Sequence, residues 1–340
     1  MMRSEATGLL LVVFIALAPT TVTRRTLLFF RWGVFAAACA LLYLRLSGHQ
    51  GNVPRWEGFI TALSPFPYGI VVVVLGMMVL NWSLEARKWQ LLVRPLQPLG
   101  FVRAFAGTIA GTAIGLITPN RVGEFAGRVL FLEPEHRVQG SFATVLGSLA
   151  QFVVTLLMGG VAVLVGRYVH QSHHLLTHAW DVLVWSTLLM AGAAVLLFFS
   201  PGVFGRILLV IPWLRRFERQ ALALERSDGS MLWRVFGWSA VRYAVFTLQF
   251  ALLLHALAGV PLADAMTAVP VIFLVTTLVP TTALTELGVR SSVAATFVNG
   301  DASAVVLATA LVWMINIVVP ALAGSVVLLV ARIRTTPEGT

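Results

Sequence analysis

Charged side chains are scarce in this sequence: Asp, Glu, Lys and Arg make up 11% of its 340 residues. A soluble domain has about 25% charged residues, enough to coat its surface. Apolar residues make up 58% of the chain, which excludes a water-soluble globule of this size. We expect an all-α polytopic membrane protein, because a helix satisfies its own backbone hydrogen bonds inside a bilayer.

Cysteine and lysine each occur once, as Cys39 and Lys88. A single cysteine excludes a disulfide framework and a CxxC metal site. The P-loop motif GxxxxGK[ST] is absent, so the chain lacks the usual phosphate-binding loop of an ATP-driven transporter. The segments between the apolar runs are too short for a separate catalytic domain. We therefore expect no enzymatic activity and no cofactor.

The sequence is strongly basic, but it has no soluble domain that could carry a basic patch. The formal net charge is +10, yet the basic residues are spread over short loops between apolar runs. This distribution indicates membrane topology and contact with anionic lipid rather than nucleic-acid binding. His170, His174 and His178 are spaced to hold a metal on one helix face, but a His-rich interfacial loop is the simpler interpretation. We expect neither a nucleic-acid partner nor a metal.

Long apolar runs are what the sequence has in abundance. A helix needs ~20 residues to cross a bilayer. Six stretches approach or exceed that length: 27–46, 68–84, 142–165, 182–199, 232–257 and 304–331. Two more apolar regions, 104–132 and 263–298, are interrupted by proline and polar residues and carry charges. We expect about six full spans plus two broken helical regions.

The basic segments predict the orientation of the chain. Arginines concentrate in 87–103, in 200–234 and at the C-terminus, which we place on the cytoplasmic side of a bacterial inner membrane. Each interrupted region then enters and leaves the membrane on one side, as a re-entrant hairpin. Its arms reach about 16–26 Å, short of the ~30 Å hydrocarbon core. The alternative, a kinked span plus a surface helix, puts arginine-rich loops on both sides.

The two interrupted regions resemble each other. Each has a Pro, then a Glu, then an Arg four residues after the Glu: Pro119, Glu124 and Arg128, and Pro280, Glu286 and Arg290. This spacing places Glu and Arg on one helical face in the favoured order. We expect two halves in an inverted-topology repeat, 24–166 with hairpin 104–132 and 180–334 with hairpin 263–298. Inverted repeats are usual in secondary transporters.

Residues 1–23 stand apart from these halves. Arg3 followed by the apolar run 8–22 is typical of a signal peptide. A short anchor helix or an over-extended start would look the same. We treat the segment as peripheral.

Charges inside the apolar regions require a partner or water. A central charge costs about 2.5–3.5 kcal/mol, and six facing lipid would cost roughly 15–20 kcal/mol. We predict that they face one another or a hydrated cavity, joined by polar neighbours. The predicted substrate-binding residues are Arg121, Glu124, Arg128, Arg242, Glu286, Arg290, Asn81 and Arg87. The predicted hairpin breaks are Pro119, Gly123 and Pro280.

Two interpretations of these charges remain open. In one, the Glu–Arg pairs only lock the hairpin tips. In the other, they also line a cavity for a lipid headgroup, whose phosphate arginine can grip with two hydrogen bonds. The intramembrane amides of Asn81, Gln151, Gln249 and Asn316 can likewise be interhelical contacts or ligands.

Several short motifs, in this order and spacing, resemble one known family. They are Asn81-Trp82-Ser83-Leu84-Glu85-Ala86-Arg87-Lys88-Trp89, Pro119-Asn120-Arg121-Val122-Gly123-Glu124 with Arg128, Gly147-Ser148-Leu149-Ala150-Gln151 and Thr285-Glu286-Leu287-Gly288-Val289-Arg290. The chain resembles the lysylphosphatidylglycerol synthase transmembrane region, a flippase-like domain, over roughly 27–331. The resemblance implies an integral membrane protein that moves or binds lipids. Full-length synthases add an aminoacyl-transferase domain; we expect a stand-alone member without that activity.

The leading functional hypothesis is a lipid flippase-like transporter. Its expected partners are membrane lipids, either anionic phospholipids or polyprenyl-phosphate lipids, and a separate lipid-modifying enzyme. A membrane enzyme or enzyme subunit acting on a lipid headgroup is the first alternative. A non-transporting membrane scaffold, with purely structural charge pairs, is the second.

Overall fold

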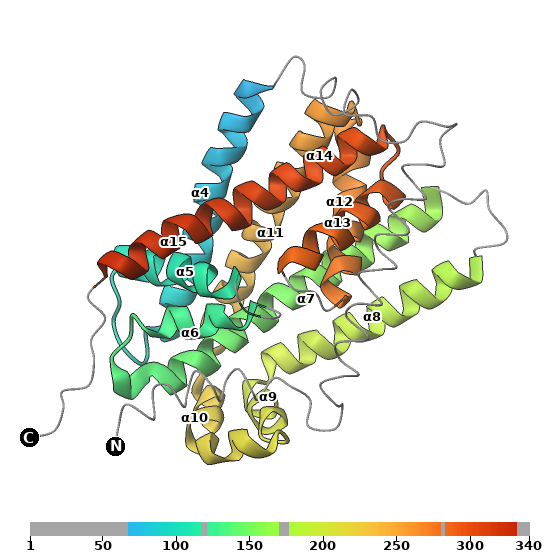
Figure 1. The fold of residues 1–340 in the computed structure, drawn as a ribbon. Coiled ribbons are helices and arrows are strands. Elements are labelled where there is room, and N and C mark those ends of the chain that lie inside the picture. Colours follow the sequence, from blue (N-terminus) through green and yellow to red (C-terminus); the bar gives the residue numbers. More distant parts are fainter. Residues whose placement is uncertain (1–66, 117, 119–120, 170–176, 280–282, 332–340) are drawn as a thin grey trace, which may run out of the picture.

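The computed structural model describes residues 67–116, 118, 121–169, 177–279 and 283–331, and these form a bundle of helices without strands (Figure 1). The all-α prediction is therefore confirmed for this part of the chain. The N-terminal segment 1–23, the expected span 27–46, and the breaks Pro119 and Pro280 lie outside the described residues. The helices are α4 (Tyr68–Val93), α5 (Phe101–Leu116), α6 (Gly123–Val129), α7 (Arg137–Val169), α8 (Thr177–Phe199), α9 (Pro201–Leu208), α10 (Glu218–Leu222), α11 (Gly229–Ala258), α12 (Leu262–Leu278), α13 (Ala283–Phe297), α14 (Ala302–Trp313) and α15 (Val319–Val330).

Four helical stretches of the described residues are long and apolar enough to cross a membrane: Tyr68–Val93, Pro134–Gly166, Gly229–Ala258 and Ala302–Val330. A fifth candidate is α8 with α9, which are bent by 100° between Phe199 and Pro201. These stretches coincide with the expected spans other than 27–46. The chain is a multi-pass helical membrane protein, and a total of six spans remains a prediction.

Apolar side chains on the outside of the bundle agree with a hydrocarbon surrounding. Leu189 on α8 is 78% exposed, and Leu329 on α15 is 86% exposed. Such residues would be costly in water but are favoured against lipid tails. The buried interior forms two apolar clusters, one centred on α7 and α8 and the other on α11, α12 and α14.

The first interrupted region folds into two closely packed helical arms, α5 and α6. A Cβ on Gly127 would lie 2.5 Å from the Cα of Gly111, and one on Gly123 would lie 2.6 Å from the carbonyl oxygen of Ile114. Only glycine permits this approach of the two backbones. At 16 and 7 residues the arms reach about 24 and 10 Å, so neither crosses a bilayer alone.

The second interrupted region forms α12 and α13, which also pack against each other. They contain 17 and 15 residues, with Pro270 inside α12. The joining residues 280–282 lie outside the described part of the chain. The helical arms expected over 263–298 are thus present, whereas their placement as a re-entrant hairpin remains a prediction.

A π-helical turn, Met314–Val318, joins α14 to α15. It contains Asn316, whose amide Nδ2 donates to the carbonyl oxygen of Val312 at 3.1 Å. π-turns of this kind are frequent at functional sites. In Figure 1, α15 runs across α5, and the two helices pack together. The turn therefore lies on a helix that supports the first hairpin.

Candidate functional site

One face of α4 carries the polar residues of the first motif. Asn81, Glu85 and Lys88 follow one another at spacings of four and three, which places them on the same side of a helix. The face is buried: Glu85 is 5% exposed and Lys88 is 2% exposed. The run expected to end at Leu84 continues as one helix to Val93. Lys88, expected to begin a cytoplasmic segment, is in fact an interior residue.

Glu85 is the centre of the site. Its Oε2 lies 2.7 Å from Nζ of Lys88 and 3.4 Å from Nη1 of Arg242, and its Oε1 lies 2.7 Å from Nη1 of Arg128. One buried carboxylate thus contacts three cations from α4, α6 and α11. Charge-assisted hydrogen bonds of this kind are strong. Removing either the carboxylate or one of its cations would destabilise the protein, because the remaining charge would be buried without its partner.

Arg242 connects this centre to α7 directly and to the π-turn Met314–Val318 through Trp82. Its Nη1 donates to Oε1 of Gln151 on α7 at 3.1 Å, and its guanidinium lies 5.6 Å from the ring centroid of Trp82. Trp82 in turn donates through Nε1 to the carbonyl oxygen of Asn316 in the π-turn, at 3.2 Å. The arginine predicted from its position in the second half therefore meets residues of the first half.

The tip of the first hairpin adds two more charges. Arg121 forms an ion pair with Glu124, and Oε2 of Glu124 lies 3.5 Å from Nη2 of Arg128. Thr118 fixes the turn, because its hydroxyl accepts a hydrogen bond from the backbone N–H of Gly123 at 2.8 Å. Arg121 has a φ of +57°, in the left-handed region that costs a non-glycine residue about 1–2 kcal/mol. Strain of this kind tends to occur at functional positions.

The second hairpin contributes a matching pair. Nη2 of Arg290 lies 2.8 Å from Oε1 of Glu286, and the side chains are 11% and 13% exposed. The Arg290 guanidinium also lies 5.9 Å from the ring centroid of Phe273. Glu286 attracts Arg121 electrostatically and Arg290 repels it, without a direct ion pair between Arg121 and Glu286. We therefore group the charges of the two hairpins, whereas the inverted repeat stays a prediction.

We call this group the ion cluster; its members are Glu85, Lys88, Arg121, Glu124, Arg128, Arg242, Glu286 and Arg290. Its five cationic side chains and three carboxylates give a formal excess of two positive charges. Within the described residues, Nε of all four arginines and Nη1 of Arg290 are buried without a hydrogen-bond partner. The ion cluster therefore has an excess of positive charge and N–H donors without hydrogen-bond partners, and both features suit a phosphate.

Two predicted site residues take other positions. Arg87 is exposed, with Nη1 donating to Gln90 at 3.1 Å and the guanidinium 4.2 Å from the Phe101 ring centroid. Asn81 is buried beside the ion cluster but donates through Nδ2 to Oδ1 of Asn316 at 3.2 Å. That contact corresponds to the interhelical role left open for the amides. A lipid-binding role for Arg87 and Asn81 stays a prediction.

Two members of the ion cluster, Glu85 and Lys88, were absent from the predicted set. The available signal was their helical spacing from Asn81, which continues the buried face past the end of the apolar run. Hydropathy alone ends the predicted span 68–84 just before the first charged residue, Glu85. The partners that neutralise those charges, Arg128 and Arg242, are far away in the sequence.

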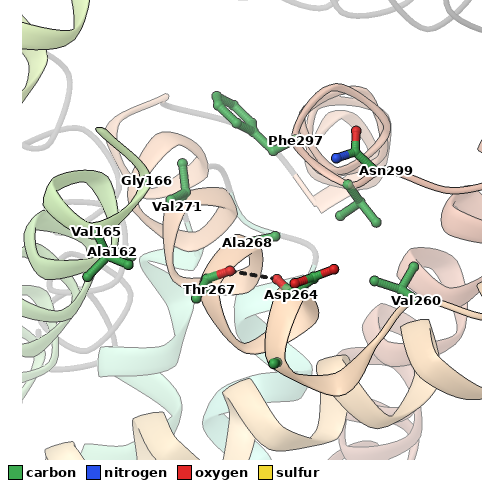
Figure 2. A pocket seen from close by; sticks show the side chains of 12 residues that line it. Ala162, Val165, Gly166, Val260, Asp264, Thr267, Ala268, Val271, Phe297 and Asn299 are labelled. Atoms are coloured by element: carbon green, nitrogen blue, oxygen red, sulfur yellow. Dashed lines mark hydrogen bonds between the residues drawn. The ribbon is translucent and has the colours of Figure 1, made fainter. Parts of the chain in front are cut away.

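A separate cavity of about 300 Å³ lies at the far end of α7, between α7, α12 and the end of α13 (Figure 2). Its lining is mainly apolar, with polar groups from Asp264, Thr267 and Asn299. The Thr267 hydroxyl donates to the backbone carbonyl of Asp264 at 2.8 Å. None of the lining residues belongs to the ion cluster, so the cavity is not the predicted charge site.

One group among the described residues has the donor atoms for a metal. The ligand atoms of Glu133, Glu135 and His136 lie within 4.8 Å of one another. Glu135 is 73% exposed, which is ordinary for a solvated acidic turn. His170 and His174 lie outside the described residues, so the spacing argument for them is untested.

The fold and the ion cluster define a class: a multi-pass helical membrane protein with a net positive group of charges, formed by residues of two long helices and of the two regions of paired short helices. The lysylphosphatidylglycerol synthase TM region family matches residues 54–329, and the chain belongs to that family. The resemblance inferred from the motifs is thereby confirmed. No curated protein matches the chain closely enough to identify a particular relative.

Proposed function

We propose that this protein is a lipid flippase-like transporter that binds a phosphate-bearing headgroup at the ion cluster. The observation that carries the proposal is the excess of two positive charges in a group of buried and part-buried side chains among apolar helices. Unbalanced charge in a low-dielectric site is costly unless an anion joins it. Family membership points to a protein related to the handling of lipid headgroups.

Four arginines favour phosphate over a simple carboxylate. The planar guanidinium presents parallel N–H donors that match two oxygens of a phosphate. In Arg290, Nη2 donates to Glu286, whereas Nε and Nη1 are buried without a hydrogen-bond partner and are available to an anion. The anion is a phospholipid or a polyprenyl-phosphate lipid in this proposal. Glu85, Glu124 and Glu286 hold the arginines in place and can exchange a proton during transport.

Alternating access would come from the two halves rocking around the ion cluster. In an inverted repeat, two broken hairpins meet near the midplane and form the substrate site. The short arms of α5 and α6 and the contact between Arg242 of the second half and Glu85 of the first are consistent with such a site. We place the protein in the bacterial inner membrane with a cytoplasmic C-terminus, and we assign it no covalent chemistry.

The scaffold alternative explains the Glu–Arg pairs but not the charge excess. A purely structural group would be expected to balance its charges, because each unpaired buried cation destabilises the fold. The ion cluster instead has more cations than carboxylates and buried donors without partners. This difference favours a site that an anion completes.

Translocation in proteoliposomes tests the proposal. A fluorescent anionic phospholipid is placed in one leaflet, and its appearance in the other is followed by chemical quenching. We expect Arg290→Gln to slow transfer at least tenfold, a loss of about 1.4 kcal/mol of headgroup interaction. Arg94→Gln, which removes an exposed arginine outside both the ion cluster and the predicted substrate-binding residues, should transfer at the wild-type rate. Equal rates for the two variants would contradict a phosphate site at the ion cluster, and conversion of a labelled lipid precursor would favour an enzyme.

A further inference from the structure

The segment between α8 and α11 forms a compact helical unit at one end of the bundle. Residues 201–226 contain α9, the 3-10 turn Pro212–Phe217, α10 and the 3-10 turn Ala223–Arg226. In Figure 1, α9 and α10 lie together at the lower end of the molecule, beyond the end of α8. We call residues 201–226 the α9–α10 unit.

The direction of α9 relative to α8 determines how the unit meets the membrane. With 23 residues, α8 extends about 34 Å and is long enough alone to cross the ~30 Å hydrocarbon core. The chain then turns by 100° into α9. If α8 crosses the bilayer, α9 lies nearly parallel to the membrane plane. Pro201, at the first position of α9, agrees with a fresh helix start there.

Aromatic side chains mark the level of the bilayer surface at this turn. Phe199, the last residue of α8, lies 4.6 Å from the ring centroid of Trp233 on α11. Trp233 is 62% exposed. Tryptophan is enriched at membrane–water interfaces, where an amphipathic ring meets the headgroups. Because α9 begins two residues after Phe199, it starts at that same level.

The outer face of α9 is apolar, whereas its inner face packs against α10. Val203 and Ile207 lie one helical turn apart on α9 and are each 49% exposed, and Val210, in the turn that follows α9, is 71% exposed. On the opposite side, Gly205 packs directly against the backbone of Ala221. Among the described residues, nothing covers the row Val203–Ile207–Val210. An apolar row of this spacing on a helix parallel to the bilayer favours insertion into the interface.

Basic residues accompany that apolar row. Three exposed arginines lie shortly after α9 in the sequence: Arg215 and Arg216 on the 3-10 turn Pro212–Phe217, and Arg219 on α10. Arg206, on α9 itself, is 67% exposed and lies 3.9 Å from Glu225. Basic residues near a membrane surface contribute about 1 kcal/mol each when the lipids are anionic. Such a pattern suits lipid headgroups better than a protein groove.

We propose that the α9–α10 unit is an interfacial platform that inserts its apolar row among anionic lipids and binds their headgroups through these arginines. The platform is distinct from the ion cluster, since it meets the leaflet surface rather than the interior of the bundle. It fixes the depth of α8 and α11 in the bilayer and enriches anionic lipid beside the protein.

Spin labelling in nanodiscs tests the depth of the platform. After Cys39→Ala, single cysteines replace Ile207, Leu189 in the lipid-facing part of α8, and the exposed Ser230. Collisions with oxygen and with a water-soluble nickel chelate report depth. The Ile207 label should lie between the other two, protected from nickel but open to oxygen. Nickel access equal to that at Ser230, or protection from both quenchers by a protein cover, would overturn the proposal.

Lipid selectivity tests the arginines. The fraction of motionally restricted spin-labelled phosphatidylglycerol is compared with that of phosphatidylcholine. Changing Arg215, Arg216 and Arg219 together to Gln should lower the preference for phosphatidylglycerol about twofold or more. Changing the same three residues to Lys, which keeps their positive charge, should leave that preference unchanged. An unchanged preference in the triple Gln variant would overturn anionic binding by the platform, whether or not the ion cluster binds phosphate.

Discussion

At the residue scale, the site depends on Glu85. One carboxylate holds three cations, of which Lys88 comes from its own helix and Arg128 and Arg242 from others. The three cations therefore share the charge of Glu85, and Arg128 alone of them has a second carboxylate, Glu124. Removing the charge of Glu85 and removing one cation should have very different consequences.

We predict that Glu85→Gln lowers the free energy of unfolding by about 3–5 kcal/mol, because it leaves buried cations without a counter-charge. Lys88→Met should cost only about 1–2 kcal/mol, since Glu85 keeps both arginines and the positive excess decreases. Unfolding by denaturing detergent in mixed micelles measures both. Similar losses for the two variants would mean that Glu85 is not the centre of the charge group.

The backbone of Arg121 gives a second prediction. Its φ of +57° suits glycine and penalises any residue with a Cβ. Arg121→Gly should therefore be more stable than Arg121→Ala by about 1 kcal/mol, although both lack the guanidinium. The same unfolding assay measures the difference, and both variants should lose anionic lipid equally. A more stable alanine variant would show that the turn is not left-handed at this position.

At the element scale, the hairpin of α5 and α6 sets the position of the charges. Gly111 and Gly127 let the two backbones approach, and this contact positions Glu124 and Arg128 on α6. The sequence predicted these arms from their short length, the interruption of the apolar region and the repeated Glu–Arg spacing. It did not predict the continuation of α4 to Val93, because its charges are neutralised by partners 43 and 157 residues away.

A larger side chain between α5 and α6 should push the two helices apart and shift Glu124 and Arg128, which α6 carries. Gly127→Ala should destabilise the protein by about 1–3 kcal/mol, since the added Cβ would meet the Cα of Gly111. It should also weaken lipid retention without removing any charged group. Gly237→Ala on α11, where a Cβ would meet nothing within 4 Å, is the matched control and should be neutral or stabilising. If the variants behave alike, close packing of the hairpin is not required.

At the scale of the whole molecule, the ion cluster draws on both halves of the chain. Arg242 comes from the second half and contacts Glu85 of the first, whereas Glu286 and Arg290 pair with each other. The inverted repeat from which the sequence analysis expects a meeting of the two hairpins stays a prediction. Which side each hairpin enters from depends on a bilayer and on residues beyond the described part, so topology stays a prediction. Function depends on what the excess positive charge binds.

Native mass spectrometry of the purified protein measures that most directly. Anionic phospholipid retained by the wild type is compared with that retained by Arg121→Ala, Arg290→Gln and the exposed control Arg94→Gln. We expect the first two variants to lose bound lipid and Arg94→Gln to keep it. Equal retention by all four proteins would contradict a phosphate-bearing headgroup at the ion cluster.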